Sequence, residues 1–151
     1  MENLQLSEWH IEGLDGAKVP TLASFAPQPL LILFYHTGCP GCKARALPYA
    51  NTVHWEYPQL RVVGLHTRPE GPAYSDTQIE EVIKVYGLKF PIYKDKGKET
   101  FESWGAEGTP HWFLLDGNGH LYRSLFGSTP NALMRLDLAL TELGLEKVDI
   151  D

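Results

Sequence analysis

Apolar residues occur in short dense runs along the chain, and stretches rich in glycine and proline separate them. Residues 30–35 are apolar at every position, and residues 60–66 are largely apolar, which favours strands buried on both faces. A third run at 111–115 precedes Asp116-Gly117-Asn118-Gly119, a strong hairpin turn signal, and residues 120–126 follow it. The pattern predicts two interior strands and then an antiparallel hairpin.

Helical signals lie between and after these strands. A helix over about residues 40–55 should follow the first strand, with a kink at Pro48. Ser75 and Gln78 have the spacing of a capping box and should begin a second helix. Thr129 stands before a proline and a leucine-rich amphipathic stretch, which predicts a capped final helix.

The N-terminal region is predicted to be an extension of the core. Residues 4–12 alternate weakly and a turn signal follows at Asp15-Gly16, so residues 1–29 should contain a small β-hairpin. Residues 30–151 should form the core of one domain. The order hairpin, β, α, β, α, short β, β, β, α predicts an α/β sandwich with a mixed sheet.

Composition narrows the class of protein. A chain of 151 residues with 43% hydrophobic residues suits one domain with an ordinary core. The net charge of −6 argues against a general nucleic-acid binder, which needs a basic surface. There is no run of 18 apolar residues, so no membrane span is expected. The N-terminus lacks signal-peptide features, which predicts a cytoplasmic location, or a periplasmic or extracytoplasmic one if a leader has been removed.

The only two cysteines form the motif Cys39-Pro40-Gly41-Cys42 directly after the first apolar run. The order strand, turn, C-x-x-C, helix places Cys39 in the first helical turn. The free backbone N–H groups and the helix dipole there favour a thiolate. Pro40 suits an early helical position. We interpret the motif as a reversible dithiol/disulfide pair.

Two other interpretations of the cysteines were weighed. In the first, both cysteines are buried core residues, as free cysteines often are. In the second, they form half of a structural zinc site. Zinc needs four ligands, and there is neither a second C-x-x-C nor a histidine pair at ligand spacing. Both interpretations fit the position of the motif less well than redox chemistry does.

Three blocks of residues resemble the thioredoxin-like fold family, most closely its redoxin or TlpA-like branch. They are Leu31 to Lys43 with the C-x-x-C motif, Gly108 to Gly119 with Thr109-Pro110, and Gly13 to Pro20 before the core. The resemblance covers nearly the whole chain and implies a three-layer α/β/α sandwich with a mixed central sheet.

The resemblance also implies roles for individual residues. Cys39 would be the exposed nucleophile and Cys42 the buried resolving thiol. Pro110 would be a cis-proline facing the disulfide, and Thr109 would offer backbone groups to an extended substrate chain. No metal or organic cofactor is implied beyond the redox-active disulfide Cys39–Cys42. The expected partners of this monomer are a protein disulfide or small-thiol substrate and a reductase or thiol that regenerates the dithiol.

Four positions depart from the family pattern. Gly38 stands where thioredoxins have a tryptophan, and Leu33 stands where they have a buried aspartate. Arg45 replaces a glutamate common in the TlpA-like branch, and Pro48 lies one residue later than usual. Without the acid, proton removal from the resolving thiol would rely on water or another base.

Residues around the motif are expected to tune its chemistry. Pro40 and Gly41 have no side chain that donates a hydrogen bond, so they should stabilise a thiolate less than a histidine would. His36, Lys43 and His111 are candidates for a place beside the site, although each also suits an ordinary structural role. We expect a moderate reduction potential.

The sequence therefore predicts a thiol-disulfide oxidoreductase, acting as a reductase. A peroxiredoxin-like thiol peroxidase is less consistent with it, because the T-x-x-C motif is absent: Thr37 lies two residues before Cys39. A non-enzymatic binding module is the other alternative, and the intact C-x-x-C and Thr109-Pro110 argue against it. The loop 68–74 is a candidate partner-binding surface or simply loop surface.

Overall fold

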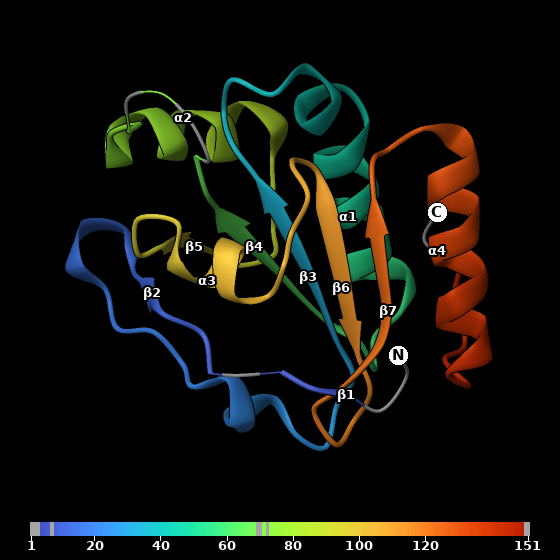
Figure 1. Cartoon of the computed structure of the whole chain (residues 1–151). Helices are drawn as coiled ribbons and strands as arrows, with labels where there is room; N and C mark the ends of the chain where they lie inside the picture. The colour runs from blue at the N-terminus through green and yellow to red at the C-terminus, as the bar shows by residue number, and fades with distance from the viewer. Residues whose placement is uncertain (1–3, 7, 69–70, 72, 150–151) are drawn as a thin grey trace.

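A single mixed β-sheet organises the molecule (Figure 1). The computed structural model describes residues 4–6, 8–68, 71 and 73–149. In this part of the chain the sheet has seven strands in the order β1-β7-β6-β3-β4-β5-β2. The strands are β1 Leu4–Gln5, β2 Ile11–Glu12, β3 Leu30–Tyr35, β4 Arg61–His66, β5 Ile92–Asp95, β6 His111–Leu115 and β7 His120–Phe126.

Helical elements connect these strands, and the helices that the sequence predicts are among them. They are η1 Leu14–Gly16, η2 Leu22–Phe25, η3 Cys42–Ala46, α1 Leu47–Glu56, α2 Asp76–Tyr86, α3 Glu99–Ser103 and α4 Pro130–Glu142. In α2 the predicted capping box is present, because Ser75 accepts from the Gln78 N–H and Gln78 accepts from the Ser75 N–H. Thr129 caps α4 by accepting from the Ala132 N–H at 3.2 Å.

Strand β3 lies at the centre of the sheet, as its continuous apolar pattern predicts. None of its six residues is more than 2% exposed. It runs parallel to β4 and antiparallel to β6, while β4 runs parallel to β5 and β6 antiparallel to β7. Because β3 and β4 are parallel, their carboxyl ends meet at one edge of the sheet, from which the C-x-x-C helix begins (Figure 1).

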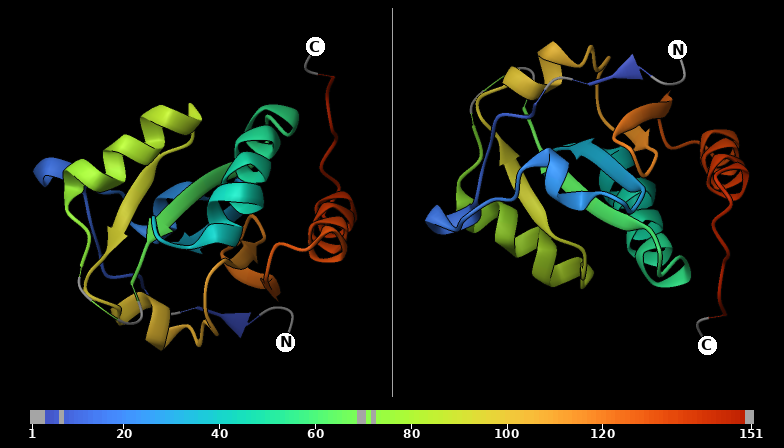
Figure 2. Two further views of the ribbon diagram at one scale, coloured as in Figure 1. Left: turned by 90° about the horizontal axis from the view of Figure 1, so that it is seen from above. Right: turned by 90° about the horizontal axis from the view of Figure 1, so that it is seen from below.

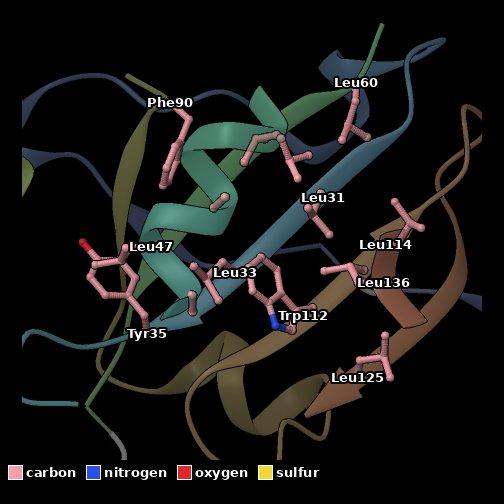
Figure 3. Close-up of a cluster of buried hydrophobic side chains, with 14 of the residues drawn as sticks. Leu31, Leu33, Tyr35, Leu47, Leu60, Phe90, Trp112, Leu114, Leu125 and Leu136 are labelled. Carbon is pink, nitrogen blue, oxygen red and sulfur yellow. The ribbon is translucent and has the colours of Figure 1, made fainter. Parts of the chain in front are cut away.

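Helices cover both faces of the sheet, so the three-layer α/β/α architecture is confirmed. Figure 2 shows the sheet between α1 and α2 on one side and α3 on the other. The larger core, partly drawn in Figure 3, joins β3 and β6 to α1, α2 and α4 and contains both cysteines. The smaller core joins the opposite face to α3, η2 and the N-terminal segment, through residues such as Trp9, Ile11 and Phe101.

A π-helical turn forms the start of the cysteine helix. The helix runs from Pro40 to Glu56, as expected, and its segment η3 widens so that the Leu47 N–H donates to the Cys42 carbonyl. Pro48, the second residue of α1, has no N–H and its ring crowds the carbonyl four residues earlier. The wider turn accommodates the proline without ending the helix.

The predicted N-terminal hairpin is wrong. Strands β1 and β2 do not pair with each other: β1 pairs with β7 and β2 with β5, at opposite edges of the sheet. Asp15-Gly16 lies in η1, a single 3₁₀ turn, rather than between two paired strands. The segment crosses the face that carries α3, where burial of Trp9 and Ile11 holds it in place. Residues 1–3 and 7 lie outside the described residues.

Within the described part of the chain, none of the helices is both long enough and apolar enough to cross a membrane.

Candidate functional site

The two cysteines are joined in a disulfide at the start of the cysteine helix. Cys39 follows the loop that leaves β3 and is 6% exposed, whereas Cys42 is fully buried in the larger core. Cys39 is thus the more accessible sulfur, although it is less open than the resemblance implies. Gly38 and Pro40, which flank it, are exposed.

One backbone N–H group is directed at the Cys39 sulfur. The Cys42 N–H donates to Cys39 Sγ at 3.2 Å. The Cys39 carbonyl accepts from the Lys43 N–H at 3.2 Å, which fixes the first helical turn. An N–H directed at sulfur favours the thiolate once the disulfide is reduced, and the N-terminal end of the helix dipole acts in the same direction.

The loop before β6 faces the disulfide, and the Thr109–Pro110 peptide bond is cis, as expected. Cys39 Sγ lies 3.7 Å from the Thr109 carbonyl oxygen. The Gly127 N–H donates to the Pro110 carbonyl at 2.8 Å, which ties this loop to the end of β7. The Thr109 backbone therefore lies beside the Cys39 sulfur.

Ser128 connects the end of β7 to the cysteine helix. Its hydroxyl donates to the Gly41 carbonyl at 3.2 Å, and its own carbonyl accepts from Arg45 Nε at 2.9 Å. Arg45, which departs from the family pattern, thus holds the β7–α4 connection against the helix that carries the cysteines.

A cluster of His36, Arg68 and Tyr74 surrounds Gly38. Arg68 Nη1 donates to the Tyr74 hydroxyl at 3.1 Å and lies 3.3 Å from His36 Nδ1. The His36 and Tyr74 rings are stacked, with centroids 6.2 Å apart. A Cβ on Gly38 would collide with the Tyr74 hydroxyl, so these side chains occupy the space that a tryptophan at residue 38 would need. Burial and the nearby Arg68 charge lower the pKa of His36.

His66, at the end of β4, supports the cysteine loop, the residues between β3 and Cys39. Its Nε2 accepts from the Thr37 N–H at 3.1 Å, and its ring packs edge-on against Tyr35 and Tyr74. Burial lowers the pKa of His66 to about 4, and the charges on His36 and Arg68 act in the same direction. His66 is therefore neutral at neutral pH.

His111 is on the face of the sheet that carries α3, whereas the cysteines are on the other. Its Nδ1 accepts from the Glu107 N–H at 3.2 Å, and its Nε2 is 2.7 Å from the Ser124 hydroxyl. Its ring stacks on Phe113 in the smaller core, and burial lowers its pKa. These contacts give His111 a structural role.

Three other positions complete the surroundings of the disulfide. Lys43 is partly buried, and its side chain forms no hydrogen bond or ion pair with the residues that the structure describes. Leu33 is fully buried in the same core as both cysteines, which places an apolar side chain where thioredoxins have an acid. No group of three or more metal-binding side chains suited to a metal ion occurs in the described ranges.

Sequence reasoning did not assign Arg68, Tyr74 or His66 to the site. A signal was available, because two predicted parallel strands bring their carboxyl ends together. Residues that follow β4 must then lie beside those that follow β3.

Fold and site together define a thioredoxin-like protein with a disulfide at a helix N-terminus. A thiol-disulfide isomerase from Corynebacterium glutamicum superposes with a TM-score of 0.81 at 24% identity, covering 93% of this chain and 96% of that one. The thioredoxin-like superfamily protein SPOA0173 superposes with a TM-score of 0.80 at 27% identity, covering 96% of this chain and 99% of that one.

The sequence comparisons identify the family. Residues 4–124 match the AhpC/TSA family model, so the chain belongs to the AhpC/TSA family. A relative named thiol-disulfide oxidoreductase ResA, from Bacillus thuringiensis subsp. konkukian (strain 97-27), is 28% identical over 117 residues. That match covers 78% of this chain and 65% of the relative, so the chain spans just under two thirds of the relative's length.

Proposed function

We propose that the protein is a thiol-disulfide oxidoreductase that reduces disulfides with the Cys39–Cys42 dithiol. The observation that carries the proposal is the placement of the Cys39–Cys42 disulfide at a helix N-terminus, with Cys39 Sγ 3.7 Å from the Thr109 carbonyl. The name of the ResA relatives supports the same reaction class.

The reaction is two successive thiol-disulfide exchanges. The Cys39 thiolate attacks one sulfur of a substrate disulfide, a mixed disulfide forms, and the first substrate thiolate leaves and takes up a proton. The Cys42 thiolate then attacks Cys39 Sγ and releases the second substrate thiolate. Two electrons pass from the protein dithiol to the substrate, and the Cys39–Cys42 disulfide remains. A reductase or a small thiol returns the two electrons.

The chain's own residues assist each exchange. The Cys42 N–H, which donates to Cys39 Sγ, stabilises the attacking thiolate. The Thr109 backbone lies beside that sulfur and supplies groups for pairing with an extended substrate chain. Because Leu33 has no proton-accepting group, we assign removal of the Cys42 proton to water.

Cysteine variants test the two assigned roles. Cys39→Ser removes the nucleophile and should abolish reduction of a disulfide substrate. Cys42→Ser keeps the attack but removes the resolving step, so a mixed disulfide should accumulate and be detected by intact mass. A Cys42→Ser protein that turns over like the wild type would contradict the assignment.

We propose that the net direction is reduction, as expected in a reducing compartment. Equilibration of the protein against glutathione buffers, read by thiol alkylation and mass, gives the reduction potential. A value near or below the cytosolic glutathione poise supports a reductase. A much more positive value would indicate an oxidant in an extracytoplasmic compartment and contradict this direction. We also propose that the protein acts as a monomer, which its molar mass in solution would test.

Peroxide reduction is a second candidate, favoured by membership of the AhpC/TSA family. Against it, the residue three positions before Cys42 is Cys39 itself, so the T-x-x-C arrangement is absent. The test is the rate at which the reduced protein consumes hydrogen peroxide, compared with its rate on a disulfide peptide. A faster reaction with peroxide would establish the peroxidase.

A further inference from the structure

Arg68 brings a positive charge to the edge of the redox site. An ideal Cβ on Gly38, the residue before the nucleophile, would lie 3.3 Å from Arg68 Nη1. The guanidinium also lies over the Tyr74 ring at 5.1 Å, and Tyr74 Oη and His36 Nδ1 are its two hydrogen-bond partners. These contacts hold the charge in one place beside Gly38, the residue before Cys39.

Among the residues that the structure describes, the partners of Arg68 are the neutral side chains of His36 and Tyr74. Neither a hydrogen bond nor an ion pair joins it to a carboxylate among the residues that the structure describes, and its buried Nε has no hydrogen-bond partner there. A partly buried guanidinium is normally paired with an anion, because loss of hydration is costly without one. Arg68 thus has no anionic partner among the described residues and is suited to bind an anion.

Two further basic residues lie on the same side of the molecule as the disulfide. Lys43 and Arg45 belong to the π turn that begins at Cys42, and neither forms an ion pair with a described residue. The whole chain carries a net charge of −6. Lys43 and Arg45 thus add two positive charges to the helix that carries the cysteines, in a chain of negative net charge, and this favours an anionic substrate.

We propose that Arg68 binds a carboxylate that lies next to the disulfide of the substrate, and so selects acidic disulfides. This rests on the proposed reductase function and names its substrate class. The planar guanidinium fork matches a carboxylate, and it lies beside Gly38, the exposed residue that precedes Cys39. Suitable carboxylates are the terminal carboxylate of a glutathione-type disulfide and an aspartate or glutamate beside a cystine in a peptide.

The experiment compares matched substrates. The reduced protein is mixed with disulfide peptides that differ only in a glutamate, glutamine or lysine beside the cysteine. A second pair of substrates is glutathione disulfide and its derivative in which both glycine carboxylates are converted to amides. The wild type should reduce the glutamate peptide about tenfold faster than the glutamine peptide in kcat/KM, as expected for one charge-assisted pair. The glutathione pair shows whether a terminal carboxylate serves as well as a side chain. The preference should fall as salt rises.

Variants assign the preference to Arg68. In Arg68→Gln the ratio of the glutamate to the glutamine rate should fall to near one, and Arg68→Lys should restore part of it. Lys84→Gln, which removes an exposed charge on α2, is the matched control and should keep the ratio. Equal rates on the two peptides in the wild type, or an unchanged ratio in Arg68→Gln, would overturn the proposal. No reduction of any peptide by the wild type would instead overturn the proposed function.

Discussion

His66 is a buried histidine whose neutral form supports the cysteine loop. Its Nε2 accepts from the Thr37 N–H, and burial lowers its pKa from 6.5 to about 4. The unfolded chain therefore binds a proton below about pH 6.5 that the folded protein does not bind until about pH 4. The contribution of His66 to stability is fully present above pH 6.5 and is lost as the pH falls towards 4.

We expect the free energy of unfolding to fall between pH 6.5 and 4, with His66 accounting for about 3 kcal/mol. Urea unfolding at several pH values measures it. His66→Gln keeps an acceptor for the Thr37 N–H but does not titrate, so the stability difference between wild type and variant should shrink as the pH falls. A constant difference from pH 7 to 4.5 would show that folding does not lower the pKa of His66.

At the residue scale, local motifs predicted the disulfide and the cis-proline but not the side chains around them. Cys39, Cys42 and Pro110 are contained in short blocks whose geometry is local. His111 also belongs to such a block, yet alternation along β6 turns it away from Trp112 and the cysteines. Arg68 reaches Gly38 only because β4 lies parallel to β3, a contact between segments distant in sequence.

At the scale of elements, a capping signal can position a side chain of the site as well as start a helix. The Ser75 box begins α2 directly after Tyr74, so the same turn that starts this helix also places a ring of the Arg68 cluster. Ser75→Ala removes the side-chain acceptor for the Gln78 N–H and should lower the free energy of unfolding by about 1 kcal/mol. Chemical denaturation measures it.

Thr77→Ala is the matched control for Ser75→Ala. It removes a hydroxyl from an exposed position inside the same helix and should leave stability unchanged or slightly raised, because alanine is the better helix former. Equal effects of the two variants would mean that the cap contributes nothing.

Elements that depend on local pattern were predicted well, and elements that depend on distant partners were not. The central strand, the hairpin at residues 116–119 and the capped helices are local. From the sequence, Pro48 predicts only a kink in the helix. The π turn before it, by which the helix accommodates the proline, could not be predicted. The two-residue strands β1 and β2 are defined solely by their pairing with β7 and β5, so their own alternation could not identify their partners.

For the molecule as a whole, the N-terminal segment completes the smaller core. Trp9 is 7% exposed, packs edge-on against Phe25 and donates from Nε1 to the Pro20 carbonyl at 3.1 Å. Trp9→Ala should lower the free energy of unfolding by about 3–5 kcal/mol, since it opens a cavity beneath the segment.

Trp55→Ala provides the comparison for Trp9→Ala. Trp55 is 51% exposed on α1, so its loss should change stability far less. Urea unfolding, monitored by circular dichroism, measures the stability of both variants. Similar losses in the two proteins would show that the N-terminal segment does not contribute to the core as described.

The pairing of β1 and β2 with opposite edges of the sheet also determines when, during synthesis of the chain, the sheet can be completed. Leu4 pairs with Leu121 and Ile11 with Asp95, so neither strand has a partner until most of the chain has been made. Closing such long loops is slow. Trp9 and Ile11 therefore stay in contact with water, or with chaperones, while the rest of the nascent chain emerges, and their docking is a late event.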